Sequence, residues 1–217
     1  MRIVIAGGHG QIALILERLL EQRGDSVAGL IRNPAQSPDL VSAGAEPIVI
    51  DLEQSSPADV AKHLEGADAV VFAAGAGPGS GAARKETVDR DAAILLADAA
   101  ELAGVHRYVM ISSMGADTAA TGGDPVFAAY LRAKGAADDA VRARTDLRWT
   151  IVRPGQLTNE RATGLVRIAE TTGRGPIPRA DVAAVLLAVL DAPQTAGRTF
   201  EAIGGDTPVA EAITALG

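Results

Sequence analysis

The amino-acid sequence predicts an α/β protein built on a doubly wound parallel sheet with helices on both faces. Apolar runs of strand length alternate along the chain with segments whose apolar residues recur at helical spacing. The strand-length runs are continuously apolar, which is typical of parallel strands covered on both faces. With 217 residues, 47% of them hydrophobic, the chain is ample for one core and short for two. We therefore expect a single domain over residues 1–217.

The first strand and the turn after it predict a phosphate-binding site. Residues 2–6 are mostly apolar and lead into Gly7-Gly8-His9-Gly10, and helical spacing begins directly afterwards. Gly7 permits a tight turn, Gly10 leaves room for a pyrophosphate beside the backbone, and Ala13 lets the helix pack closely on the strand. The start of the helix offers free N–H groups and a partial positive charge. A glycine turn that binds nothing is the alternative, but this context favours a dinucleotide contacted by Gly7, Gly8, His9, Gly10, Gln11 and Ile12.

The residue after the second strand bears on which dinucleotide binds. That strand is expected over residues 26–31, and Arg32 follows it, at the position that faces the adenosine ribose in such folds. An acidic residue there would accept hydrogen bonds from the 2′-hydroxyl of NAD, whereas a cation suits the 2′-phosphate of NADP. Arg32 therefore favours NADP. NAD is possible if this side chain is only an exposed arginine at a strand end.

The third and fourth strands are expected to bring more residues to the same edge of the sheet. They are predicted over residues 47–52 and 69–75. Asp51 at the end of the third strand could hold the adenine amino group or cap the following turn, and turn chemistry leaves both open. From these two strand ends we assign to the cofactor Asp51, Leu52, Ala73, Ala74 and Gly75.

The segments around the fourth strand are predicted from their glycine and alanine content. A short helix over residues 57–64 precedes the strand. The glycine-rich segment 75–81, which includes Pro78, is expected to be a mobile loop beside the cofactor. A long helix rich in alanine and leucine follows over residues 84–103 and ends at Gly104.

Serine, tyrosine and lysine residues form the second chemical signal. The fifth strand, expected over residues 107–115, carries Ser112 and Ser113 near its end. Tyr130 and Lys134 follow at the opening of another helix, where residues four apart share one face. A tyrosine and a lysine at this spacing are common by chance, but their place after a strand ending in serines favours chemistry. Ser112 and Ser113 should point to opposite sides of the strand, which leaves open the one that faces the cofactor.

A third stretch completes the pattern. The sixth strand begins at Trp149 and leads through Arg153-Pro154-Gly155 into the polar loop Gln156-Leu157-Thr158-Asn159-Glu160. Residues 177–183 then open a helix, and residues 198–205 read as a final strand. Together with the spacing Gly7-x-x-Gly10-x-x-Ala13, these motifs make the whole chain resemble the atypical short-chain dehydrogenase/reductases. This is a Rossmann-fold, NAD(P)-binding group of NAD-dependent epimerase/dehydratase-like proteins.

The resemblance implies catalytic roles for Ser113, Tyr130 and Lys134. Tyr130 would give a proton to a carbonyl oxygen, or remove one from an alcohol, while hydride passes to or from the nicotinamide. Ser113 would orient the substrate oxygen. Lys134 would support the phenol and hold the nicotinamide ribose, and Pro154 would lie in a structural corner under the nicotinamide.

Two departures from the family pattern concern the proton relay. Asp89 stands where the wider superfamily often has an asparagine, and Ala73-Ala74 replace the asparagine of the fourth-strand motif. We favour an NADP-dependent oxidoreductase acting on a small carbonyl or alcohol, with a non-catalytic NADP(H)-binding sensor, similar to NmrA-like relatives, as the alternative. A nucleotide-sugar epimerase or dehydratase is less favoured, because the part of the chain after Arg153 is short for a lobe that holds a second nucleotide.

The remaining expectations come from composition. The formal charge of −7 opposes binding to nucleic acid, the absence of cysteine excludes thiol chemistry, and three scattered histidines argue against a metal site. The first strand leaves no space for a signal peptide and the apolar run 182–190 is too short to cross a bilayer, which favours a cytoplasmic protein that binds no membrane. The expected partner is a small-molecule substrate, and the protein is expected to be a monomer or a small homo-oligomer. A small carboxyl-terminal substrate region is expected. Candidates for the wall of the substrate pocket are Phe127, Met114 and residues 158–176.

Overall fold

The computed structural model describes residues 1–77 and 79–217, and it confirms the predicted α/β fold. Pro78, which belongs to the loop expected at 75–81, lies outside the described residues. In the described part of the chain, the strands of the main sheet are β1 (Arg2–Ala6), β2 (Ser26–Ile31), β3 (Glu46–Val49), β4 (Ala69–Phe72), β5 (Arg107–Ile111), β6 (Arg148–Pro154), β8 (Leu165–Ala169), β10 (Arg198–Gly204) and β11 (Thr207–Pro208).

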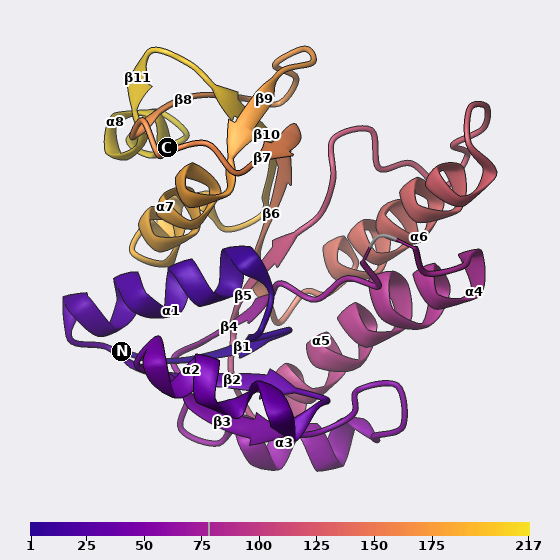
Figure 1. The fold of residues 1–217 in the computed structure, drawn as a ribbon, viewed down its shortest axis with the longest axis vertical. Helices are drawn as coiled ribbons and strands as arrows, with labels where there is room; N and C mark the ends of the chain where they lie inside the picture. The colour runs from indigo at the N-terminus through magenta and orange to yellow at the C-terminus, as the bar shows by residue number, and fades with distance from the viewer. Residues whose placement is uncertain (78) are drawn as a thin grey trace.

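The order of these strands places the binding edge of the sheet. It runs β11-β8-β10-β6-β5-β4-β1-β2-β3, so the chain builds outward from β1 in one direction and then from β4 in the other. The first three strands therefore lie on one side of the junction between β1 and β4, as expected (Figure 1). Open α/β sheets bind ligands outside the carboxyl ends of the strands at such a switch point.

Helices cover both faces of the sheet (Figure 1). One face carries α1 (Gln11–Arg23), α2 (Ser37–Ser42), α7 (Arg179–Leu190) and α8 (Val209–Thr214). The other face carries α3 (Pro57–Leu64), α5 (Ala92–Leu102) and α6 (Pro125–Arg142). Short single-turn segments are η1 (Pro34–Gln36), α4 (Ala82–Arg84) and η3 (Pro193–Thr195). Among the described residues, no helix is both long enough and apolar enough to span a lipid bilayer.

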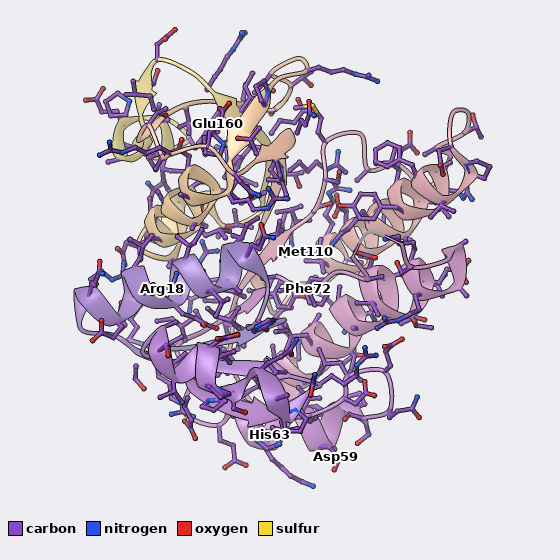
Figure 2. The ribbon with its side chains drawn as sticks, viewed as in Figure 1. Arg18, Asp59, His63, Phe72, Met110 and Glu160 are labelled. Atoms are coloured by element: carbon purple, nitrogen blue, oxygen red, sulfur yellow. The ribbon has the colours of Figure 1, made fainter. Side chains whose placement is uncertain are left out.

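Each face of the sheet has its own apolar core. The continuously apolar strands supply both cores, because successive residues point to opposite faces. Ile3 and Ile5 pack against α1 and α7, whereas Val4 packs on the face of α3 and α5. Figure 2 shows Phe72 and Met110, two fully buried side chains of the second core, in the middle of the molecule.

The expected long helix over 84–103 is not a uniform α-helix. Its first half is the π-helix η2 (Lys85–Asp91), which joins α4 to α5. In a π-helix each N–H bonds the carbonyl five residues back, so the turn holds an extra residue and the side chains are rotated relative to an α-helix. The buried residues of this segment are Lys85, Val88 and Asp89. The alanine and leucine pattern of α5 carries no sign of this change.

The carboxyl-terminal part also differs from the expectation of a purely parallel sheet. β8 pairs antiparallel with β10 on one side and with β11 on the other. The strand over 198–205 was expected to be the last strand, but β11 and then α8 follow it. β7 (Gln156–Thr158) and β9 (Pro176–Pro178) form a separate two-stranded parallel sheet, and β7 directly follows β6 along the chain.

The ends of the strands lie earlier than predicted. β3 ends at Val49, β4 at Phe72 and β5 at Ile111, so the residues assigned to the cofactor and to catalysis follow the strands as irregular backbone. The tyrosine and lysine are likewise not at the start of their helix, since α6 begins at Pro125. Asp124 caps this helix by accepting hydrogen bonds from the N–H groups of Val126 and Phe127.

A buried acid lies directly behind the glycine turn. Glu17 of α1 is 0% exposed, and neither carboxylate oxygen has a hydrogen-bond partner in the described part of the molecule. A Cβ at Gly29 would lie 2.8 Å from Glu17 Oε1, and one at Gly8 would lie 3.0 Å from it. Glycine at both positions therefore makes room for the carboxyl group. Burial raises the pKa of Glu17 to about 8, against a smaller lowering by Arg18.

The raised pKa of Glu17 predicts that the free energy of unfolding falls as the pH rises. Its pKa moves from the ordinary 4.5 to about 8 on folding, so the folded state holds more protons between these values. Glu17 should reduce the stability by up to about 1.4 kcal/mol per pH unit in this window. The Glu17→Gln variant should lose this slope and be the more stable protein at about pH 9. Urea unfolding at a series of pH values measures both effects.

Glu65→Gln is the matched control, because Glu65 is exposed. Its stability should follow that of the unmodified protein across the pH range. An unchanged slope in Glu17→Gln would show that the carboxyl of Glu17 is stabilised by solvent in the folded protein.

Candidate functional site

Two cavities meet at the carboxyl ends of the strands, around the glycine turn. The smaller cavity, about 410 Å³, lies at the ends of β2 and β3, and the larger cavity, about 760 Å³, lies between the ends of β4, β5 and β6. The residues that line both cavities are His9, Gly10, Ala73, Ala74 and Gly75. The arrangement is thus a pair of compartments joined at the start of α1.

The glycine turn has the geometry that a phosphate needs. Gly7 has a φ of 81°, and a Cβ there would lie 2.6 Å from the Cα of Ala74, so only glycine fits without a shift. Gly10 is the N-cap residue of α1, and no side chain caps the helix. The first N–H groups of α1 are therefore available to an anion. These residues fit the pyrophosphate of a dinucleotide.

Gly8 does not contribute to this surface. It lines neither cavity, and a Cβ at this position would lie 2.8 Å from the Cα of Gly29. Gly8 thus permits close packing of the turn on β2. The other residues assigned to the turn, namely Gly7, His9, Gly10, Gln11 and Ile12, line one cavity or both. His9 also pairs with Asp39, with 2.7 Å between Nε2 and Oδ2.

A group of charged residues lines the smaller cavity. Arg32 lies there, and it donates a hydrogen bond from Nη1 to Glu53 Oε2, at 2.8 Å. Arg84 donates to the same oxygen at 2.8 Å, and Thr87 donates to Oε1 at 2.7 Å. The hydrogen bond from Thr87 and the two guanidinium groups hold the pKa of Glu53 below its ordinary value. Glu53 and Arg84 were not identified from the sequence.

Asp51 caps the turn after β3. Its Oδ1 accepts a hydrogen bond from the N–H of Glu53 at 3.0 Å, which is the capping alternative. The residue also lines the smaller cavity together with Leu52. Capping and an interaction with adenine are therefore compatible at this position.

Tyr130 and Lys134 both line the larger cavity. They lie one turn apart on α6, and Lys134 Nζ is 6.0 Å from the centroid of the Tyr130 ring. The Tyr130 ring is partly buried and stacks on Phe127 with 5.9 Å between ring centroids. Phe127 thus forms part of the cavity wall, as expected, whereas neither Met114 nor residues 158–176 line it.

Lys134 pairs with Asp89, the residue that stands where the wider superfamily often has an asparagine. The lysine is 3% exposed, and its Nζ lies 3.4 Å from Asp89 Oδ1 and 3.2 Å from the carbonyl oxygen of Ile111. Asp89 is 1% exposed and accepts a hydrogen bond from the N–H of Ala76 through Oδ2, at 3.2 Å. The aspartate that replaces asparagine is therefore the counter-ion of Lys134.

The two serines follow β5 and both line the larger cavity. Ser112 is 3% exposed and its hydroxyl has no hydrogen-bond partner in the described residues, whereas Ser113 is partly exposed and donates to the carbonyl oxygen of Met114 at 3.2 Å. Because both residues lie beyond the end of the strand, the strand alternation on which the sequence interpretation depended does not apply. The more exposed hydroxyl is that of Ser113.

Two cations in the larger cavity were also missed. Lys85 of η2 and Arg179 of α7 line it, together with Pro154 and Leu157. Lys85 is a charged residue on the buried face of its helix, and Arg179 approaches from a segment far along the chain, so no local pattern marks either residue as part of the cavity. In residues 1–77 and 79–217, no group of three or more His, Asp or Glu side chains is arranged to hold a metal ion.

Comparisons with known proteins agree with this site. A family model described as NAD(P)H-binding matches residues 7–193. The chain is 37% identical over 217 residues to a Bacillus subtilis protein named an uncharacterized sugar epimerase, YhfK, and the match covers 100% of both chains. It is also 31% identical over 229 residues to a UPF0659 protein of Schizosaccharomyces pombe, covering 97% of this chain and 92% of the relative.

Two solved structures have the same fold over nearly the whole chain. A Bacillus halodurans protein, provisionally named an NAD-dependent epimerase/dehydratase, has a TM-score of 0.91 and 37% identity, with 99% of each chain covered. The oxidoreductase ylbE of Lactococcus lactis has a TM-score of 0.88 and 28% identity, covering 100% of this chain and 96% of the other. The fold, the glycine turn and these matches together show that the chain belongs to the NAD(P)H-binding family of atypical short-chain dehydrogenase/reductases.

Proposed function

We propose that this protein is an NADP-dependent oxidoreductase that reduces a small carbonyl compound or oxidises the corresponding alcohol. The observation that carries the proposal is that Tyr130 and Lys134 line the same cavity as the start of α1. A side chain that can transfer a proton thus lies in the compartment expected to receive the nicotinamide.

Tyr130 is the proposed proton-transferring group. The nicotinamide, when bound, supplies or accepts the hydride. The ammonium groups of Lys85 and Lys134 lie 5.4 and 6.0 Å from the Tyr130 ring centroid, so both place positive charge beside the aromatic ring. Ser113, whose hydroxyl is the more exposed of the two serines, would orient the substrate oxygen for this transfer.

The charges of the smaller cavity support NADP over NAD. Two guanidinium groups, those of Arg32 and Arg84, share one carboxylate, that of Glu53, so this three-residue cluster is positive, while Asp51 balances the charge of the cavity lining as a whole. Each guanidinium has five N–H donors, so donors are left for a 2′-phosphate while the Glu53 contacts persist. The side chain of Arg32 is 54% exposed and accessible to a ligand.

Epimerisation is the second candidate function. The name of the Bacillus subtilis relative, a sugar epimerase, favours it. A nucleotide-sugar epimerase would interconvert two sugar epimers with no net consumption of cofactor, whereas a reductase consumes NADPH. Incubation with UDP-glucose and UDP-galactose, monitored by NMR, separates the two. A non-catalytic sensor would bind NADP(H) and act on neither these sugars nor carbonyl compounds.

Tyr130→Phe tests the proposed proton transfer. The ring and its stacking on Phe127 remain, so the affinity for NADPH should be nearly unchanged. Turnover of a carbonyl substrate found by screening should fall by a factor of about 10² to 10⁴. Tyr108→Phe is the matched control, because Tyr108 lies outside both cavities and its hydroxyl bonds the carbonyl oxygen of Ala93. Turnover by Tyr130→Phe at the unmodified rate would rule out this role.

Lys134→Ala should impair both turnover and cofactor binding. The side chain is proposed to serve the phenol and the nicotinamide ribose together. Its removal also leaves Asp89 buried without its counter-ion, which should lower the free energy of unfolding by about 3–5 kcal/mol. Calorimetry with NADPH and urea unfolding measure the two effects. Unchanged affinity in a folded variant would contradict the ribose contact.

Arg32→Asp tests the cofactor preference. It removes a charge-assisted contact and adds repulsion, so binding of NADP should weaken by about 2 kcal/mol or more, while NAD should be little affected. Glu53→Gln should shift the preference the other way, because it removes the negative charge that the two arginines share. Calorimetry with both cofactors gives the ratio of affinities.

Arg161→Asp is the control for these variants, since Arg161 is exposed and lines neither cavity. Its ratio of NADP to NAD affinity should equal that of the unmodified protein. Equal affinity for the two cofactors in the unmodified protein would show that Arg32 is only a surface residue.

A further inference from the structure

Lys85 is a buried cation that faces the larger cavity without an acidic partner. Its exposed fraction is 8%. In the described part of the chain its ammonium donates one hydrogen bond, to the carbonyl oxygen of Gly77 at 2.8 Å, and forms no ion pair with a carboxylate. The same nitrogen lies 5.4 Å from the centroid of the Tyr130 ring. Burying an ammonium is costly unless a counter-charge or several hydrogen bonds compensate for the lost water.

Lys134 provides the comparison within the same cavity. It is 3% exposed and has a carboxylate, that of Asp89, at 3.4 Å. Two buried lysines therefore line one cavity, and only Lys134 has a carboxylate partner in the described residues. The carbonyl oxygen of Gly77 and the ring of Tyr130 compensate for part of the water that the Lys85 ammonium loses on burial. The missing part is a negative charge.

A third cation extends the positive surface of the cavity. Arg179 is partly buried at the first turn of α7, and its Nη1 donates to the neutral oxygen Oδ1 of Asn159 at 2.7 Å. The acidic residues that line the cavity are Asp89, which pairs with Lys134, and Asp124, which is engaged in capping α6. The protein as a whole has a formal charge of −7, so this excess of positive charge is local to the cavity.

We propose that the substrate carries an anionic group, a carboxylate or a phosphate, and that Lys85 recognises it, with Arg179 as a second cation lining the same cavity. The inference rests on the proposed function in assigning this cavity to the substrate. An anion held by Lys85 would lie next to Tyr130, so this contact would fix which end of the substrate faces the proton-transferring hydroxyl. The phosphates of the cofactor are the other source of the same charge.

Matched pairs of probes test the preference for an anion in the unmodified protein. The pairs are pyruvate with methyl pyruvate, benzoylformate with methyl benzoylformate, and dihydroxyacetone phosphate with dihydroxyacetone. Calorimetry on the NADP⁺-loaded protein, which has no hydride to give to the ketone probes, should show, for at least one pair, that the anionic member binds more tightly by about tenfold or more. Neutral members that bind as tightly as the anions would overturn the proposal, as would a failure of all six probes to bind.

Variants of Lys85 then assign the preference to this residue. Lys85→Met should weaken binding of the anionic probe by about tenfold or more and leave the neutral probe within about twofold. Lys85→Arg should retain most of the preference, because it keeps the charge. Lys62→Met is the matched control, since Lys62 is an exposed lysine of α3 that lines neither cavity. The probe comparison in the unmodified protein stands even where a variant fails to fold.

The affinity for NADPH without any probe separates the two sources of the anion. It should be unchanged in Lys85→Met. A loss of about tenfold would show that Lys85 binds a cofactor phosphate, and the substrate assignment would be wrong. These measurements need no turnover, so their failure is distinguishable from a failure of the catalytic proposal, which Tyr130→Phe tests.

Discussion

The buried ion pair between Lys134 and Asp89 is the interaction on which the geometry of the site depends. It joins α6 to η2, and each partner makes a further contact: Lys134 with the carbonyl oxygen of Ile111, and Asp89 with the N–H of Ala76. Two helices and the ends of β4 and β5 are thus tied together at one point. Because both side chains are almost fully buried, neither can lose its partner without leaving an uncompensated charge.

A second buried pair fixes the same helix one turn further on. Arg153 of β6 donates two hydrogen bonds to Oδ2 of Asp138, at 2.8 and 2.6 Å, and Asp138 is 0% exposed. The arginine of the Arg-Pro-Gly stretch therefore anchors α6 to the sheet and does not line either cavity. Lys134 and Asp138 lie one turn apart on α6, and both follow Tyr130, so the two pairs fix the part of the helix directly after the tyrosine.

The sequence predicted the parts of the site that depend on local geometry. The tight turn at Gly7, the lack of a side chain at Gly10 where α1 begins and the position of Arg32 after β2 follow from neighbours along the chain. The partners of these residues could not be predicted, because they come from distant segments. Glu53 is 21 residues from Arg32, and Asp89 and Lys134 belong to different helices. The π-helix was missed for a different reason, since nothing in the alanine-rich pattern signals a change of hydrogen bonding.

The π-helix makes one continuous helical segment serve both compartments. Arg84 and Val88 line the smaller cavity, and Lys85 and Asp89 line the larger one. The extra residue of the π-helical turn therefore sets the direction in which each side chain before α5 points. Deleting one residue between 85 and 91 would restore α-helical bonding and rotate the preceding side chains by about 100°. A substitution in this segment therefore changes the lining of one compartment, whereas a change of its length alters both at once.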